Sequence, residues 1–150
     1  MSTTDEALKR RRAQFAPILD AAATRHRIEP ALLRAVAYVE SRFNPMALGP
    51  VCGANAERAR GIVQLMPAVC RELGVIDPHD AAQSAEAGAK LLARHLAHFG
   101  GDESKALGAY NWGRGNMDRL AADQLPPKQV RTYVARVLAR RVVETPGTPT

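Results

Sequence analysis

Apolar residues recur at helical spacing along most of this chain, and the alternation of β-branched residues that marks strands is scarce. Alanine is abundant and aromatic residues make up only 5% of the 150 residues, a composition that favours helices. With 46% hydrophobic residues, the chain is long enough to bury one sizeable core. The sequence therefore predicts an all-α, mainly helical single domain over residues 1–144. Residues 145–150, TPGTPT, are predicted to form a disordered tail.

Proline and glycine mark most of the expected helix boundaries, because proline suits the first turn of a helix and glycine suits its end. Pro67 starts and Gly74 ends a short helix, while Ser84 is the expected cap of a long helix that stops at Gly100. Residues 44–60, rich in Gly, Pro and Asn, predict a loop. The predicted helices cover residues 5–26, 30–40, 67–73, 84–99 and 106–111 and the stretch after 125–127.

A carboxylate, Glu40, lies on the apolar stripe of the second predicted helix. Leu32, Val36 and Glu40 are spaced four residues apart and so share one helix face. Burial raises the pKa of a carboxyl because it disfavours the charged form, and a raised pKa suits a general acid near neutral pH. An ion pair of Glu40 with Arg34 or Arg42, at the edge of the stripe, explains the same pattern. This stretch alone favours the ion pair.

The chain is basic, with a net charge of +6 and a pI near 9.9, which predicts attraction to polyanions such as anionic envelope polymers. The basic residues gather at 9–12 and again between 131 and 141. Most such runs are solvated helix faces, and no signature of a nucleic-acid-binding fold accompanies them. We therefore do not expect nucleic acid to be the partner.

The first 27 residues contain basic residues but lack the long apolar core and small-residue cleavage site of a secretory signal. No apolar stretch approaches the roughly 20 residues that cross a bilayer. We expect neither a Sec signal nor a transmembrane segment in this sequence.

Metal-ligand spacing is missing as well. The four histidines are scattered without an HExxH arrangement, and Cys52 and Cys70 have no CxxC spacing. We expect no metal site and two free thiols.

Four short motifs follow one another in the chain: ESRFNP at 40–45, GIVQLMP at 61–67, AYNWG at 109–113 and LPPKQVRTYVARV at 125–137. In this order and on a helical frame, they resemble the catalytic domain of soluble lytic transglycosylases, bacterial and phage enzymes related to goose-type lysozyme. The resemblance extends from about residue 25 to about residue 138.

The resemblance implies a lysozyme-like fold with a groove for the glycan strands of peptidoglycan, and it implies no cofactor. Glu40 matches the catalytic acid, which protonates the glycosidic oxygen between N-acetylmuramic acid and N-acetylglucosamine. Amide side chains in such a groove suit acetamido groups, and phenols pack on sugar rings. The matched substrate-binding positions are Ser41, Gln64, Met66, Tyr110, Asn111, Gln129 and Tyr133.

Most glycosidases use two carboxyl groups, whereas the matched motifs supply only Glu40. A transglycosylase needs no second one, since the C6 hydroxyl of the sugar attacks the anomeric carbon and gives a 1,6-anhydromuramic product. Glu40 would act first as an acid and then as a base. Two alternatives stay open: a water-using muramidase with Glu57 as its second carboxylate, and a non-catalytic module that binds wall glycan or nucleic acid.

The chain departs from the family pattern at three places. Gly49 stands where a serine is expected before proline, residues 52–57 look inserted, and Gln129 replaces a glutamate. The first change removes a hydroxyl expected to orient Glu40, and the last removes a charge from the substrate site.

An enzyme of this kind acts on the cell wall, in the periplasm. Because we expect no Sec signal here, we expect a protein made in the cytoplasm and delivered as a phage lysin, a virion component or a substrate of a specialised secretion system.

Overall fold

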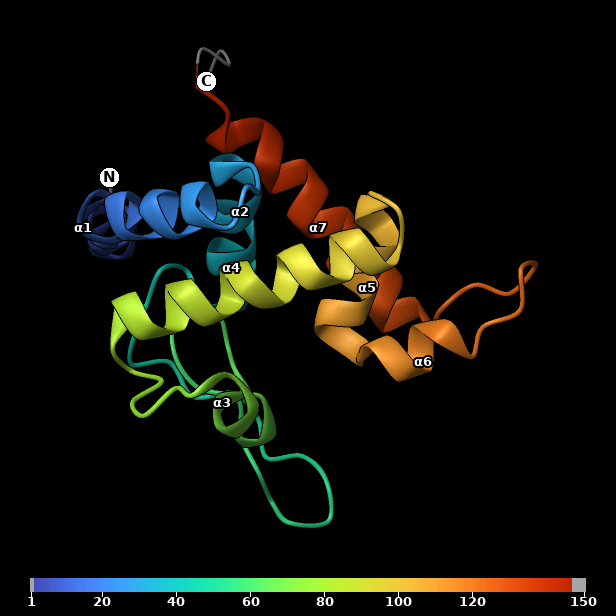
Figure 1. Ribbon diagram of the computed structural model, residues 1–150. Coiled ribbons are helices and arrows are strands. Elements are labelled where there is room, and N and C mark those ends of the chain that lie inside the picture. Colours follow the sequence, from blue (N-terminus) through green and yellow to red (C-terminus); the bar gives the residue numbers. More distant parts are fainter. Residues whose placement is uncertain (1, 147–150) are drawn as a thin grey trace.

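The computed structural model describes residues 2–146, and in that range the chain forms seven helices and no β-sheet (Figure 1). The predicted mainly helical fold is confirmed. No helix within residues 2–146 combines the length and apolar character that crossing a bilayer requires. The helices are α1 (Thr3–Arg25), α2 (Pro30–Ser41), α3 (Pro67–Leu73), α4 (Ala81–His98), α5 (Glu103–Trp112), α6 (Arg114–Asp118) and α7 (Lys128–Glu144).

Helix α2 lies against both α1 and α7 (Figure 1). Pro30 provides its first turn, and Leu32, Leu33 and Val36 bury its apolar face almost completely. The helix ends because Arg42 adopts the left-handed backbone conformation, with φ at 53°. Glu40 therefore stands in the last turn of α2, on the face that Leu32 and Val36 bury.

The core joins helices that are distant in sequence. Leu19 of α1, Leu92 of α4, Leu107 of α5 and Val137 of α7 have no exposed surface and belong to one buried cluster. Burial of each such side chain contributes about 1.5–3 kcal/mol. The cluster holds α2, α5 and α7 in fixed positions around Glu40.

The long segment between α2 and α3 is held by backbone pairing rather than by helices. Leu48 pairs with Arg60 and Arg60 with Leu65 in isolated bridges. Gly61 is required at its turn, because its φ is +91° and an added Cβ would lie 2.0 Å from the carbonyl oxygen of Pro78. Residues 61–65 are thereby pressed against the start of α4.

Helix α4 begins earlier than the sequence predicted. We expected Ser84 to cap it, but the cap is Asp80, whose carboxylate accepts a hydrogen bond from the backbone N–H of Gln83 at 3.0 Å. Ser84 is fully buried one turn into the helix, and its hydroxyl donates to the carbonyl oxygen of Pro78. The prediction was wrong because the preceding turn supplies an equally good cap one turn upstream.

Helix α6 was not predicted, and its sequence, RGNMD, includes a glycine of low helix propensity. The helix forms because Met117 is buried where α6 packs against α5. Asn116 adds a side-chain hydrogen bond to the carbonyl oxygen of Trp112 at 2.6 Å. Tertiary packing outweighs local propensity here.

The end of α7 is fixed by a buried ionic cluster. Glu144 is 2% exposed, and its carboxylate pairs with Arg12 of α1 at 2.7 Å and with Arg140 of α7 at 2.8 Å. Arg34 of α2 donates to the backbone carbonyl of Glu144 at 2.7 Å and also pairs with Asp20 at 3.0 Å. The cluster ties three helices together at the expected domain boundary.

The predicted disordered tail begins directly after Glu144. Residues 145 and 146 are exposed, and residues 147–150 lie outside the described residues. The assignment of residues 145–150 as a disordered tail stays a prediction.

We expect Glu144→Gln to lower the free energy of unfolding by about 3 kcal/mol, because it leaves three arginines facing a neutral amide in a buried site. Urea unfolding followed by circular dichroism measures the loss. Asp123→Asn, at an exposed loop position, is the matched control and should change stability by less than about 0.5 kcal/mol. Equal stabilities of the two variants would show that the cluster does not hold the helices together.

Candidate active site

Glu40 has no cationic partner among residues 2–146, so the ion-pair interpretation is wrong. Arg34 is engaged by Asp20 and Glu144, and the guanidinium of Arg42 lies 5.4 Å from the ring centroid of Tyr38. Glu40 keeps part of its surface open, but its carboxyl is largely removed from water. This desolvation raises the pKa of Glu40 from 4.5 to about 8.

Tyr133 of α7 interacts most closely with Glu40. Tyr133 is 8% exposed, and a hydrogen bond between its hydroxyl and the carboxyl lowers the pKa of Glu40, against the larger effect of burial. The contact is loose, since within residues 2–146 the hydroxyl has no partner at full hydrogen-bond geometry. Burial, with the nearby charge of Glu40, raises the pKa of Tyr133 well above its usual value. A neutral phenol thus faces the acid, with hydrogen-bonding capacity to spare.

Tyr110 of α5 is also within electrostatic reach of Glu40. Burial raises the pKa of Tyr110 well above its usual value, and the charge of Glu40 adds to the effect. Its hydroxyl donates to the carbonyl oxygen of Val63 at 2.9 Å. Tyr110 therefore joins α5 to the 61–65 segment, while the adjacent Asn111 is exposed.

The polar groups of Gln64 and Ser41 form hydrogen bonds with the backbone of the loop. The Gln64 amide donates to the carbonyl oxygens of Ala47 at 3.2 Å and Gly61 at 3.0 Å. The Ser41 hydroxyl donates to the carbonyl oxygen of Ile62 at 2.7 Å and thereby fastens the end of α2 to the loop. Both side chains therefore stabilise the loop that follows α2.

Gly49 belongs to the same arrangement. An added Cβ there would lie 2.7 Å from Oε1 of Gln64 and 3.4 Å from Cβ of Ala59. The serine expected at this position would displace the end of the Gln64 side chain. Glycine at position 49, without the serine hydroxyl, therefore leaves the space that the Gln64 side chain occupies.

Met66 and Gln129 lie at the starts of two helices. Met66 is half-buried at the residue before α3, and Gln129 is exposed in the first turn of α7. Gln129 and Tyr133 are four residues apart, so they share one face of α7. Gln129, which stands where the family pattern predicts a glutamate, thus lies on the side of α7 that carries Tyr133.

Glu57 stands at the base of the projecting 52–57 loop, where its backbone pairs with Cys52 through hydrogen bonds of 2.9 and 3.0 Å. Figure 1 shows this part of the chain extending beyond α3, away from α7.

Cys52 and Cys70 are both free thiols, as expected, one exposed and one buried.

Gly88 of α4 is a residue of this site that sequence reasoning missed. An added Cβ there would lie 2.8 Å from Cγ2 of Val63 and 3.3 Å from the hydroxyl of Tyr110. Gly88 therefore allows α4, α5 and the 61–65 segment to meet. A glycine inside a helical pattern was the available signal, since it costs about 1 kcal/mol unless packing requires it.

A helical domain that presents one raised-pKa carboxyl beside two tyrosines from other helices has the features of a lysozyme-like domain. The chain belongs to the Transglycosylase SLT domain family, whose model matches residues 17–128. The match includes Glu40, Gln64 and Tyr110 and stops before Gln129 and Tyr133.

Two curated relatives agree with this assignment. The chain is 35% identical over 100 residues to a transglycosylase of Enterobacteria phage PRD1, which covers 67% of this chain and 35% of the relative. It is 32% identical over 110 residues to the membrane-bound lytic murein transglycosylase F of Desulfosudis oleivorans, covering 69% of this chain and 23% of that protein. The chain thus spans about a third or less of the length of these relatives.

Solved structures share the fold. The 70 kDa soluble lytic transglycosylase SLT70 of Escherichia coli superposes with a TM-score of 0.71 at 22% identity, over 85% of this chain and 23% of that one. An inactive mutant of the lytic transglycosylase Slt of Pseudomonas aeruginosa superposes with a TM-score of 0.70, also at 22% identity and over the same shares. The predicted lysozyme-like helical fold is confirmed.

We expect Tyr133→Phe to raise the pKa of Glu40 above its value of about 8, by up to roughly one unit, because the lost hydrogen bond favours the charged carboxylate. NMR titration of the ¹³C-labelled glutamate carboxyls measures the shift. Tyr38→Phe on α2 should leave the Glu40 titration in place, since the pKa of Glu40 is set by burial and by Tyr133. An unchanged midpoint in Tyr133→Phe would refute the contact.

We expect the stability advantage of Glu40→Gln over the unsubstituted protein to grow as the pH rises from 4.5 to about 8. In this window the folded protein keeps a proton that the unfolded chain releases, so folding stability falls with rising pH, by at most about 1.4 kcal/mol per pH unit. The glutamine variant lacks this loss.

Urea unfolding of both proteins across the window measures the difference. Glu72→Gln, at an exposed position, should differ from the unsubstituted protein by a nearly constant amount. A constant difference for Glu40→Gln as well would rule out a strongly raised pKa of Glu40.

Proposed function

We propose that the protein is a peptidoglycan lytic transglycosylase, with Glu40 as general acid and base. The observation that carries this proposal is the pKa of Glu40, raised to about 8 by burial. At neutral pH the carboxyl is then mostly protonated, as an acid that donates to a glycosidic oxygen must be. Family membership and the phage and bacterial relatives support the same reaction.

In the first step, the Glu40 proton moves to the oxygen that links N-acetylmuramic acid to N-acetylglucosamine, and the bond between that oxygen and the anomeric carbon breaks. In the second step, the Glu40 carboxylate takes the proton of the C6 hydroxyl of the muramic acid. The C6 oxygen then bonds to the anomeric carbon and closes the 1,6-anhydro ring. Glu40 ends protonated, and no water is consumed. The ring closure benefits from the proximity of two groups within one sugar.

The tyrosine opposite Glu40 stabilises the charged form between these two steps. The loosely bonded Tyr133 hydroxyl can donate fully to the carboxylate once Glu40 has lost its proton, which lowers the cost of the intermediate charge. Tyr133 remains neutral throughout, because its own pKa is raised well above the usual value.

The substrate-binding positions fall into two groups by their hydrogen bonds. Ser41, Gln64 and Tyr110 support the groove, since their polar groups bind loop carbonyls. Asn111 and Gln129 are exposed, and their amides, which bind no other residue within 2–146, can hold acetamido groups of the glycan. Met66 contributes apolar surface under a sugar ring.

The positive charge of the chain supports approach to an anionic envelope. The net charge is +6, and cationic side chains at positions 9, 10, 27, 42 and 136 are exposed. We place the activity at the cell wall, and the phage relative supports delivery as a lysin or virion component.

A water-using muramidase requires a second carboxylate at the site. The candidate, Glu57, stands on a loop that projects away from the helix bearing Tyr133 (Figure 1). The geometry therefore favours the internal C6 nucleophile over water.

We expect incubation with purified peptidoglycan to release muropeptides that end in 1,6-anhydromuramic acid, identified by mass spectrometry. Glu40→Gln should lower their release by at least about 100-fold, because it removes the only acid and base in the proposed reaction. Glu72→Gln and Glu57→Gln should release products at the unsubstituted rate.

The identity of the products separates the alternatives. Reducing ends that disappear in Glu57→Gln would mean hydrolysis with a second carboxylate. Binding to peptidoglycan without any cleavage, equal in Glu40→Gln, would mean a non-catalytic module.

A further inference from the structure

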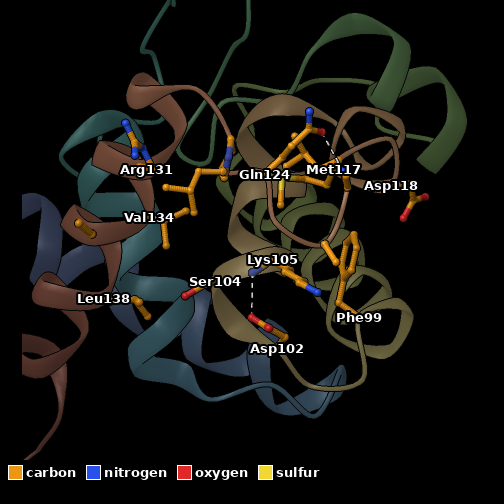
Figure 2. Close-up of a pocket in the computed structure, with 16 residues that line it drawn as sticks. Phe99, Asp102, Ser104, Lys105, Met117, Asp118, Gln124, Arg131, Val134 and Leu138 are labelled. Atoms are coloured by element: carbon orange, nitrogen blue, oxygen red, sulfur yellow. Dashed lines mark hydrogen bonds between the residues drawn. The ribbon is translucent and has the colours of Figure 1, made fainter.

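One well-defined cavity of the described chain is separate from Glu40. It has a volume of about 720 Å³ and lies between α5, α6, α7 and the loop that joins the last two (Figure 2). This volume falls within the range of about 300–1,000 Å³ that is usual for small-molecule sites. None of the substrate-binding positions assigned above lines it.

Helix α7 separates the two sites. Tyr133 and Val137 are buried on its core face, next to α2, whereas Val134 and Leu138 line the cavity. Figure 2 shows Val134 and Leu138 on one wall, with Phe99 and Met117 across from them. A ligand in the cavity would touch the helix that carries Tyr133 without entering the glycan groove.

The walls are mainly apolar. Six large apolar side chains contribute, and one of them, Leu125, is 70% exposed at the mouth. An exposed leucine beside an open apolar cavity is costly in water and gains from an apolar ligand. The apolar side chains are Phe99, Met117, Leu120, Leu125, Val134 and Leu138.

Of the charged groups that line the cavity, the two carboxylates have partners within the protein and the two cations form no ion pair with residues 2–146. Asp102 caps α5 by accepting from the backbone N–H of Lys105 at 3.0 Å, and Asp118 pairs with His98 at 2.8 Å. The side chains of Lys105 and Arg131 form no ion pair with any of residues 2–146. The cavity therefore offers apolar walls and two uncommitted cations.

We propose that this cavity binds an amphiphile with a single alkyl chain and an anionic head, taken up as a monomer from solution. The alkyl chain lies against the apolar walls, and the head meets Lys105 or Arg131. A peptide fits less well, because its backbone N–H and C=O groups would need partners that apolar walls do not supply. A neutral amphiphile would make no charge-assisted contact with Lys105 or Arg131. The proposal stands apart from glycan cleavage.

Dodecyl phosphate, titrated into the full chain below its critical micelle concentration and followed by calorimetry, is the probe. We expect saturable binding of one molecule per chain. Each methylene removed from the probe should weaken binding about fourfold. Dodecyl maltoside, which has the same chain and a neutral head, should bind more weakly.

Two pairs of variants locate the ligand. Ala135→Phe fills the cavity from an exposed position on α7 and should abolish binding, while Ala139→Phe, exposed on the same helix but outside the lining, should not. The double variant Lys105→Ser with Arg131→Ser should weaken binding about tenfold. Lys90→Ser with Arg136→Ser removes two exposed cations elsewhere and should leave the affinity unchanged.

Glu40→Gln should bind the probe as the unsubstituted protein does, so a failure of the proposed catalysis leaves this test intact. Absence of saturable binding, or equal binding by Ala135→Phe with its fold intact by circular dichroism, would overturn the proposal. Binding to phosphatidylglycerol vesicles without binding of the monomer would overturn it too, since it would mean surface attraction of a basic protein to a bilayer.

Discussion

The packing of α7 against α2 is the contact on which the site depends. The two helices run in opposite directions: Arg34, early in α2, meets Glu144 at the end of α7, and Glu40, late in α2, meets Tyr133. Arg34 and Glu40 are separated by roughly 9 Å along the helix axis. The ionic cluster and the acid are thus two ends of one interface. The contacts of Glu144 with α1 and α2 fix the far end of the helix that carries Tyr133.

Burial of Glu40 lowers the stability of the folded protein, and the proposed role as general acid gives a reason for it. A carboxyl with a pKa raised to about 8 destabilises the folded protein at neutral pH, and the loose contact with Tyr133 relieves only part of this. A cation at hydrogen-bonding distance would remove this cost, but it would also lower the pKa of Glu40, so that the carboxyl would be ionised at neutral pH. Arg34 and Arg42, the nearest candidates in sequence, are instead held by Glu144, Asp20 and the ring of Tyr38. The surrounding ion pairs thereby keep positive charge away from the carboxyl.

Much of the helical frame could be predicted from the sequence, because proline and glycine act through local backbone geometry. Pro30, Pro67 and Gly74 mark helix boundaries where they were expected. Glu40 could also be singled out, since helical spacing alone puts it on an apolar face. Where a local pattern allows two solutions, as at Asp80 and Ser84, the sequence does not decide between them, and the structure uses Asp80.

The hydrogen-bond partners of the site residues could not be predicted, because they come from distant segments. Nothing near Gln64 in the sequence indicates that its amide binds the carbonyl of Ala47, or that Gly49 must be small to allow it. The same holds for Tyr110, whose partner is 47 residues away, and for the cavity behind α7, which exists only once α6 has packed.

No carboxylate among residues 2–146 contributes to the pKa of Glu40, and this limits which nucleophile can complete the proposed reaction. Hydrolysis with one carboxyl would require that carboxyl to activate a water molecule on the face of the sugar where it has just protonated the leaving group. The C6 hydroxyl is already attached to the sugar and needs no second protein group to hold it, so a single acid can serve both steps. Gln129 does not change this, since its amide can hold an acetamido group but cannot act as a base. In the proposed reaction, the chemistry rests on Glu40 and on the substrate itself.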